Sequence, residues 1–392
     1  MKKIVSILGS TGSIGQNSLQ IFSKKKNLFE INILSGDKNF KLICKQIYKY
    51  KPKIFVVNDQ NVFQKVKKKF KKNNVKIIRE LKESESKIKK SDITIAAIPG
   101  IAGLKPTILL TKRSKKILIA NKESIICGWN LIKKTALKYR TKIVPIDSEH
   151  FSIMQLLEHH QNDVRKIYLT ASGGPFLNLS LSKLKNVKPH EAIKHPKWKM
   201  GKKISVDSAS LMNKMLEHIE AQKLFSINPE KIKIIIHPES LVHAVIELKN
   251  GLYKFIYHET TMLIPILNAI FDNKVNIDDF IKPTMNKRKK IFFKNLTFLK
   301  VDIKQFPIIK LLKRVNEHHS TPIIINAVNE ILVDQYLKKK ISFTSFYKYI
   351  LSVLNDRNYK KYAVRIPKNI SQIFLIDQWS RNITYKKIKT NA

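Results

Sequence analysis

Six short apolar runs alternate with helical patterns over the first 146 residues, and this alternation constrains the fold more than any other feature of the chain. The runs are rich in β-branched residues and cover residues 4–8, 31–34, 54–57, 93–98, 117–120 and 143–146. Strands that are apolar on both faces are typical of parallel sheets covered by helices on both sides. The sequence therefore predicts a doubly wound α/β domain over residues 1–146.

The remaining residues follow other patterns. Strand-like runs at 166–171, 231–237, 241–247 and 252–257 predict a second sheet within an α+β domain at 147–281. Residues 282–305 are basic and irregular, which predicts a linker. Helical periodicity over 323–337 and 343–354 predicts a C-terminal helical bundle within 306–392. The expected fold class is α/β, with an N-terminal Rossmann-like sheet, a central α+β domain and this bundle.

The chain is strongly basic, with 75 Lys and Arg against 29 Asp and Glu and a formal net charge of +46. Such a charge ordinarily suggests nucleic acid or an anionic membrane as a partner. Lysine, isoleucine and asparagine are abundant everywhere, however, as an AT-rich codon bias would produce. The lysine-rich run at 65–72 resembles a solvated helix face, with Val66 and Phe70 turned inward. We expect no specific nucleic-acid site, although recruitment by charge is a competing hypothesis.

The number of cysteines and the lengths of the apolar stretches indicate the cellular compartment. Cys44 and Cys127 are the only cysteines, too few for a disulfide framework or a thiolate metal cage, and they fit a reducing compartment. No apolar stretch approaches the roughly 20 residues that span a bilayer. The first apolar run begins at Ile4, which leaves no room for a signal peptide. We expect a cytoplasmic protein without a membrane partner.

A glycine turn follows the first predicted strand and opens a predicted helix. Gly9, Gly12 and Gly15 would let backbone N–H groups approach a pyrophosphate at the helix N-terminus. Their three-residue spacing differs from G-x-G-x-x-G, so a turn without a ligand is the alternative. About 20 residues further on, Asp37 favours a free ribose 2′-hydroxyl and Lys38 favours a 2′-phosphate. Spacing alone leaves the choice of nicotinamide cofactor open.

Acidic residues follow the sixth run. Asp147 and Glu149 are alternate residues of a segment that we take as extended, so both can reach one hard divalent cation. Lys122 and Glu123 follow the fifth run and should lie at the same carboxyl edge of the sheet, where ligands bind in this architecture. The alternative for Lys122 and Glu123 is a helix start with a capping ion pair.

Three polar segments occur in the second predicted domain. The turn at 172–175 carries hydroxyl groups and glycines that suit an oxyanion or phosphate, although a plain turn fits equally well. The segment 195–201 combines a histidine, a tryptophan and a hinge-like glycine, which is typical of a lid that closes over substrate. Residues 208–217 are interpreted as one helix.

On that helix, Asn213 and Glu217 share a face and Lys214 flanks them. Glu217 can supply a third carboxylate to a metal, while Ser208, Asn213 and Lys214 can donate to a phosphate. A surface pair of Lys214 and Glu217 is the alternative. Four histidines show no ligand spacing and are expected at the surface. They are His159, His160, His318 and His319.

Taken together, these motifs resemble those of the 1-deoxy-D-xylulose 5-phosphate reductoisomerase family, in order and over nearly the whole chain. The motifs cover residues 9–15, 120–124, 145–150, 172–176, 195–209, 212–214 and 325–330. The resemblance implies an NADPH-dependent rearrangement and reduction of 1-deoxy-D-xylulose 5-phosphate to 2-C-methyl-D-erythritol 4-phosphate. That reaction is the committed step of the non-mevalonate (MEP) isoprenoid pathway and uses Mg²⁺, Mn²⁺ or Co²⁺. A homodimer, with the central domain providing catalysis and dimerisation, is also implied.

The resemblance further implies residue roles. The metal ligands would be Asp147, Glu149 and Glu217. The catalytic residues would be Lys122, Glu149 and His195, all of which would also bind substrate. The other substrate-binding residues would be Ser148, Ser172, Trp198, Met200, Ser208, Asn213, Lys214 and Glu217. The cofactor-binding residues would be Thr11, Gly12, Ser13, Ile14, Asp37, Lys38, Asn39, Asn121, Glu123 and Gly201. The family's use of NADPH favours Lys38 over Asp37 as the ribose reader.

The chain departs from the family pattern at three places. Asp37 replaces a small residue, Met215 replaces a glycine, and residues 260–263 read Thr-Thr-Met-Leu where a Pro-Asp-Met-Arg-like segment is usual. A second enzyme class also competes, namely another Rossmann-type dehydrogenase acting on a phosphorylated or amino-acid aldehyde. A semialdehyde dehydrogenase would need a cysteine nucleophile, and Cys127 has no evident base in the sequence.

Overall fold

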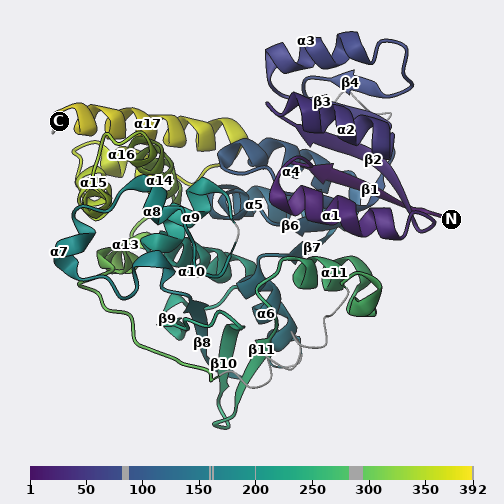
Figure 1. Cartoon of the computed structure of the whole chain (residues 1–392). Helices are drawn as coiled ribbons and strands as arrows, with labels where there is room; N and C mark the ends of the chain where they lie inside the picture. The colour runs from purple at the N-terminus through teal and green to yellow at the C-terminus, as the bar shows by residue number, and fades with distance from the viewer. Residues whose placement is uncertain (82–87, 159, 161–162, 199, 282–294, 391–392) are drawn as a thin grey trace. The chain divides into compact units, whose positions relative to one another are not determined.

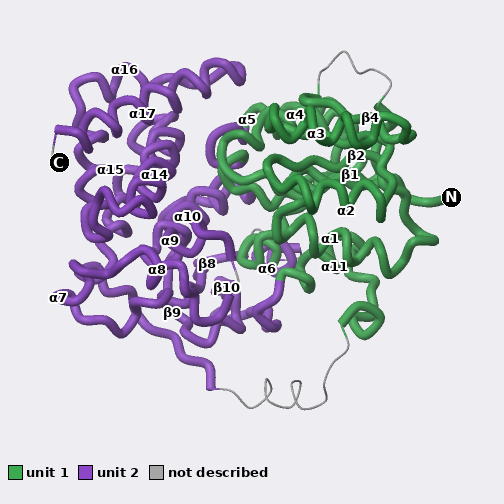
Figure 2. The backbone as a smooth tube through the Cα atoms, turned by 45° about the horizontal axis from the view of Figure 1, so that its top comes forward, with its two compact units in different colours: residues 1–124, 130–151, 262–289 green, residues 125–129, 152–261, 290–392 purple. Residues whose placement is uncertain are grey.

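The computed structural model describes the chain except for residues 82–87, 159, 161–162, 199, 282–294 and 391–392. Two compact units are distinguished by their internal contacts (Figure 2). Unit 1 comprises residues 1–124, 130–151 and 262–289, and unit 2 comprises residues 125–129, 152–261 and 290–392. The functional domain boundaries expected from the sequence stay a prediction, because a unit defined by contacts is not a unit defined by function.

Unit 1 is built on a seven-stranded sheet in which all neighbouring strands are parallel (Figure 1). The order across the sheet is β4-β3-β2-β1-β5-β6-β7. The strands are β1 (Lys3–Leu8), β2 (Phe29–Gly36), β3 (Ile54–Val57), β4 (Lys76–Ile78), β5 (Ser91–Ala96), β6 (Ser114–Ile119) and β7 (Lys142–Pro145). The predicted doubly wound sheet is confirmed. Only β4 was not foreseen, because this short edge strand lacks a fully buried face.

A helix follows each of β1, β2, β3, β5, β6 and β7 along the chain. These helices are α1 (Ser13–Lys24), α2 (Phe40–Tyr50), α3 (Gln60–Lys69), α4 (Leu104–Thr111), α5 (Lys122–Tyr139) and α6 (Ser148–Leu157). The predicted inward face of the lysine-rich run is confirmed, since Val66 and Phe70 are buried. A later helix, α11 (Leu263–Phe271), also belongs to unit 1. Lys116 fixes its end by donating to the Ala269 carbonyl at 2.8 Å and to the Asp272 carboxylate at 2.9 Å.

Unit 2 contains a four-stranded sheet in the order β11-β10-β8-β9. The strands are β8 (Val164–Ala171), β9 (Ile232–Ile236), β10 (Val242–Leu248) and β11 (Tyr253–Tyr257). β10 runs antiparallel to both of its neighbours, and β8 pairs with β9 in parallel. Inward residues of this sheet pack against Ala221 of α10 (Met212–Phe225) in one apolar cluster. The second predicted sheet is therefore confirmed.

The C-terminal part of unit 2 is helical, as predicted. Its longer helices are α14 (Thr321–Leu337), α15 (Phe346–Leu354) and α17 (Ile370–Thr390), and α17 contacts both of the others (Figure 1). Arg381 joins two of these helices, because it binds Asp377 of its own helix at 2.6 Å and also pairs with Glu330 of α14. The motif at 325–330 thus lies in a helix that organises the bundle.

The linker predicted at 282–305 lies partly outside the described residues, which resume at 295. From there the chain is anchored to unit 2, since Leu299 bridges to Ile236 and Gln305 donates to the Phe176 carbonyl at 2.6 Å. Within the part of the chain that the structure describes, no helix has the length and apolar character needed to cross a membrane.

Candidate active site

The glycine turn after β1 has two positions that admit no side chain. Gly9 has φ +80°, and a Cβ atom there would lie 2.5 Å from the Ala97 carbonyl oxygen. A Cβ atom on Gly15 would lie 2.4 Å from the Gly9 oxygen. Gly12 and Ser13 are exposed at the start of α1. The turn therefore brings two strand ends and a helix start close together and leaves backbone N–H groups open to an anion.

The ribose-reading segment follows β2. Asp37, Lys38 and Asn39 are all exposed. Both side chains that could contact the ribose 2′ position, Asp37 and Lys38, are therefore accessible. Asn39 also has a structural role, because its side-chain oxygen accepts from the Leu42 N–H at 3.1 Å and caps α2. Its place among the cofactor-binding residues stays a prediction.

Asn121 is likewise a capping residue. It stands at the N-cap of α5, and its amide donates to the Ile98 carbonyl and, at 2.9 Å, to the Gly100 carbonyl. The side chain is buried and holds the loop after β5 against the start of the helix. Glu123 lies in the first turn of α5, where a negative charge is favoured by the helix dipole.

Lys122 begins α5, so the helix-start interpretation is correct, and the lysine also pairs with a residue outside this helix. Its Nζ atom lies 3.0 Å from the Asp147 carboxylate. Burial by itself raises the pKa of Asp147, but Lys122 and His150 outweigh burial and hold this pKa well below its ordinary value. The ends of β6 and β7 thus place a buried lysine and a carboxylate with a depressed pKa side by side.

The expectation that Asp147 and Glu149 lie on an extended segment is wrong. β7 ends at Pro145, and the Asp147 carbonyl already accepts from the Phe151 N–H at 2.8 Å in the first turn of α6. The helix begins here because acidic residues are favoured at a helix N-terminus. The two side chains still offer carboxylate oxygens within 4.8 Å of one another. Ser148 donates to Glu149 at 2.6 Å.

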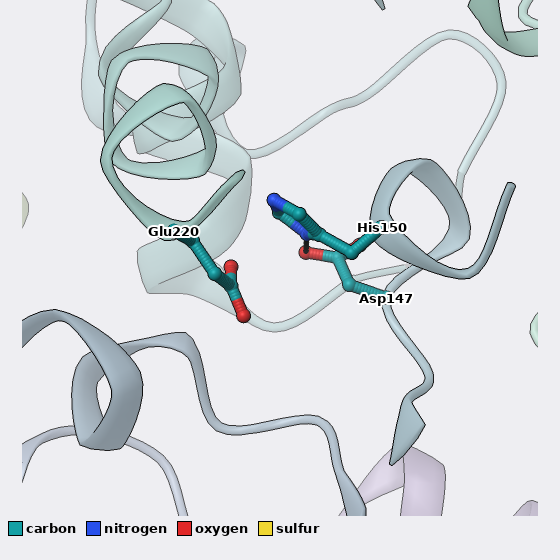
Figure 3. A group of neighbouring side chains, drawn as sticks. All are labelled: Asp147, His150 and Glu220. Atoms are coloured by element: carbon teal, nitrogen blue, oxygen red, sulfur yellow. Dashed lines mark ion pairs between the residues drawn. The ribbon is translucent and has the colours of Figure 1, made fainter. Parts of the chain in front are cut away.

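His150 is a site residue to which the sequence analysis gave no role. Its Nδ1 atom lies 3.8 Å from Asp147, and its side chain is fully buried. Figure 3 shows the imidazole next to the Asp147 carboxylate, joined by a dashed ion-pair line. The i,i+3 spacing on a helix was the available signal, and it was masked by the assumption of an extended segment. Glu220, also labelled in Figure 3, is a buried residue of α10 in unit 2.

In unit 2, the turn after β8 contacts the predicted lid segment. Gly173 and Gly174 have φ values of +79° and +66°. Ser172 Oγ and His195 Nε2 are 2.9 Å apart, and His195 Nδ1 accepts from the backbone N–H groups of Lys197 and Trp198 at 3.1 and 2.9 Å. Because Nδ1 accepts, the proton of the neutral ring is on Nε2 and is donated to Ser172.

Burial, with a smaller effect of Lys214, lowers the pKa of His195 to about 4. The imidazole is therefore neutral near pH 7 and acts as a hydrogen-bond donor. Trp198 and Met200 are half-buried in the same segment. Gly201 precedes α9 (Lys202–Ala209), and a Cβ atom there would meet nothing within 4 Å. Close packing therefore does not require this glycine.

The single helix predicted over 208–217 is wrong. α9 ends at Ala209 and α10 begins at Met212, because Leu211 adopts φ +60° between them. This left-handed conformation is unfavourable for leucine, but the side chain is buried with Ala171, Ile236 and Phe306. Ser208 consequently lies on α9, while Asn213, Lys214 and Glu217 lie on α10.

The surface interpretation of Lys214 and Glu217 is also wrong, since their exposed fractions are 5% and 1%. Lys214 Nζ lies 2.5 Å from Glu217, and Asn213 donates to the other oxygen of the same carboxylate. Two candidate phosphate donors thus surround a candidate metal ligand. Among the histidines expected at the surface, His319 is exposed, His160 and His318 are half-buried, and His159 lies outside the described residues.

Known proteins match the chain over most of its length. Three family models match, described as 1-deoxy-D-xylulose 5-phosphate reductoisomerase at residues 5–128, its C-terminal domain at 143–225 and the DXP reductoisomerase C-terminal domain at 259–383. Among curated relatives, the 1-deoxy-D-xylulose 5-phosphate reductoisomerase of Pelagibacter ubique is 44% identical, with 95% of this chain and 96% of the relative covered. The enzyme of a Wolbachia strain from Drosophila simulans is 40% identical, with 100% and 99% covered.

Solved structures agree with these matches. A DOX-P reductoisomerase in complex with NADPH, fosmidomycin and magnesium superposes with a TM-score of 0.90 at 31% identity, covering 99% of this chain and 98% of the other. The Zymomonas mobilis enzyme in complex with NADPH gives a TM-score of 0.87 at 30% identity, with 99% of both chains covered.

Proposed function

The chain belongs to the 1-deoxy-D-xylulose 5-phosphate reductoisomerase family, and from this membership we propose which of its residues perform the family's reaction. The enzyme converts 1-deoxy-D-xylulose 5-phosphate to 2-C-methyl-D-erythritol 4-phosphate with NADPH and a divalent cation, the committed step of the MEP route to isoprenoids. The observation that carries the residue assignment is the ion pair between the buried Lys122 and the half-buried Asp147, with Glu149 near Asp147, at the carboxyl end of the parallel sheet.

For the metal, we assign as ligands the three residues that the family pattern implies, Asp147, Glu149 and Glu217. Their chemistry fits, because all three offer carboxylate oxygens, which Mg²⁺ and Mn²⁺ prefer. The depressed pKa of Asp147 keeps it ionised at neutral pH. A bound cation would supply Lewis-acid polarisation of the ketone and hydroxyl oxygens of the substrate. Lys122 and Ser148 then orient the reacting hydroxyl groups as hydrogen-bond donors.

The phosphate of the substrate is assigned to Ser172, Ser208, Asn213 and Lys214. Without ligands, Asn213 and Lys214 both donate to Glu217. Because a carboxylate that binds a cation is a weaker acceptor, we expect these two donors to turn toward the phosphate when the metal is bound. This exchange would couple the binding of the metal to the binding of the phosphorylated substrate.

The cofactor is assigned to the open N-terminus of α1 and to the segment after β2. The backbone of residues 11–14 would hold the pyrophosphate, and Lys38 would pair with the 2′-phosphate that distinguishes NADPH. Asn121 would position the nicotinamide side of the site through the loop it anchors. NADPH would supply the hydride that reduces the rearranged aldehyde. His195 would donate from Nε2 as its loop covers the substrate.

The first prediction concerns turnover. Purified protein with Mg²⁺ or Mn²⁺ should oxidise NADPH only when 1-deoxy-D-xylulose 5-phosphate is added, and a chelator should abolish the reaction. Glu217→Gln keeps the shape of the side chain but removes a charge from the metal site, so activity should fall on the order of 100-fold. The exposed Glu230 provides a matched control, since Glu230→Gln removes the same charge elsewhere in unit 2. Unchanged metal dependence in Glu217→Gln would refute the assignment of that ligand.

We also infer that two copies of the chain associate through β11. This strand forms one edge of the unit 2 sheet, and its aromatic residues Tyr253 and Phe255 are 59% and 47% exposed. Exposed edge strands with apolar side chains are ready partners for a second chain. Cys44 and Cys127 are buried thiols that form no disulfide, which supports a cytoplasmic location.

A further inference from the structure

Three aromatic rings contact one another in a row in unit 2, and two of them, His243 and His258, are outside the residues assigned from the family. Trp198 of the lid segment contacts His243 edge to face, with 5.9 Å between ring centroids and an interplanar angle of 69°. His243, on β10, stacks on His258 with 3.9 Å between centroids and an interplanar angle of 20°. His258 directly follows β11, so neighbouring antiparallel strands supply the two imidazoles.

Both imidazoles are withdrawn from solvent, with exposed fractions of 2% for His243 and 8% for His258. His258 is held in place from its other side, because its Nδ1 atom donates to the Glu259 carbonyl at 2.7 Å. The Nε2 atom of each ring has no hydrogen-bond partner among the described residues. His243 is also held by a hydrogen bond to the backbone of His258. The His258 ring adds to this bond by packing on the face of the His243 ring, and it limits how far that ring can tilt.

The rings are neutral at physiological pH. Burial, then His258, Lys214 and His237, keep the pKa of His243 well below its usual value, with partial compensation from a backbone hydrogen bond. Burial lowers the pKa of His258, against a smaller opposing effect of the Glu259 backbone. Two neutral imidazoles stack without charge repulsion, so together they form a flat, largely apolar support for the indole.

We propose that His258 is a positioning residue, which acts through His243 to hold Trp198 in the orientation from which the lid closes over the substrate. The proposal rests on the proposed function, because it gives Trp198 a role in covering the substrate. Without the His258 ring, His243 keeps its backbone hydrogen bond but loses its stacking partner. Its ring can then tilt, and Trp198 is held less firmly. The enzyme would then have to order both side chains when substrate binds, and that cost appears in KM.

The test compares His258→Ala with His258→Phe, which keeps a flat ring but no titratable nitrogen. The exposed His319 in the same unit provides a control, His319→Ala. Acrylamide quenching is measured in a background with Trp129→Phe and Trp379→Phe, so that Trp198 is the remaining tryptophan. Steady-state kinetics are measured without these background changes, and thermal unfolding identifies the variants that are folded.

We expect His258→Ala to increase the quenching of Trp198 in the ligand-free protein and to raise KM for the substrate about three- to tenfold, with a smaller change in kcat. His258→Phe should restore both quantities, and His319→Ala should change neither. A folded His258→Ala protein with unaltered quenching would overturn the proposal. So would an equal rise in KM for the Ala and Phe variants, because ring stacking would then not be the cause. Quenching is measured without substrate turnover. It therefore tests the position of Trp198 even if the protein does not catalyse the proposed reaction.

Discussion

At the scale of single residues, His195 shows how a local hydrogen-bond pattern determines a chemical role. Two backbone N–H groups point at Nδ1, and Ser172 Oγ lies at Nε2. A proton on Nδ1 would face two donors, so the neutral ring carries its proton on Nε2. The sequence predicted that His195 lies in a lid but gave no indication of its tautomer, because the tautomer depends on how the chain turns between residues 195 and 198.

We predict that ¹⁵N NMR of the histidine side chains will find His195 in the Nε2–H form at pH 7. Its pKa of about 4 lies below the ordinary value of 6.5, so the folded protein favours the neutral ring. The resulting stabilisation is complete above pH 6.5 and is lost as the pH falls from 6.5 toward 4. The free energy of unfolding should therefore decrease over that interval, and less so in His195→Gln. An Nδ1–H tautomer at pH 7 would contradict the structural assignment.

At the scale of elements, several helix ends have a residue other than glycine in the left-handed backbone conformation. Lys51 follows the last residue of α2, has φ +44° and is exposed, so a lysine occupies a left-handed position that glycine adopts more easily. Leu211 is a second such position, but its buried side chain stabilises the break between α9 and α10. The polar pattern of residues 208–217 is compatible with one helix, so the break could not be predicted without the cluster into which Leu211 packs.

A substitution by glycine should change the free energy of unfolding in opposite directions just after the end of α2 and in its interior. Lys51→Gly should raise the free energy of unfolding by about 0.5–1 kcal/mol, because it relieves the left-handed strain at an exposed site. Lys45→Gly, an exposed change within α2, should lower it by about 1 kcal/mol through the helix propensity of glycine. Urea unfolding of both variants measures the difference. Destabilisation by Lys51→Gly comparable to that by Lys45→Gly would show that the left-handed position carries no strain.

At the scale of the whole molecule, association through β11 is the main expectation. Light scattering of the purified protein should give twice the mass of the chain. The double variant Tyr253→Asp and Phe255→Asp should dissociate toward the monomer, because two charges on the exposed edge disfavour burial. Phe374→Asp, on an exposed position of α17, should leave the dimer intact. A monomeric wild-type protein, or a dimer unaffected by the β11 changes, would exclude this interface.

The sequence by itself determined the parallel sheet of unit 1, the second sheet and the C-terminal helices, because buried β-branched runs and helical periodicity are local patterns. It also determined the family, since motifs keep their order and spacing along the chain. Only the tertiary structure decided that Lys122 pairs with Asp147 and that His243 and His258 stack. Each of these depends on which residues, distant in sequence, come within a few ångströms, and no local pattern encodes that distance.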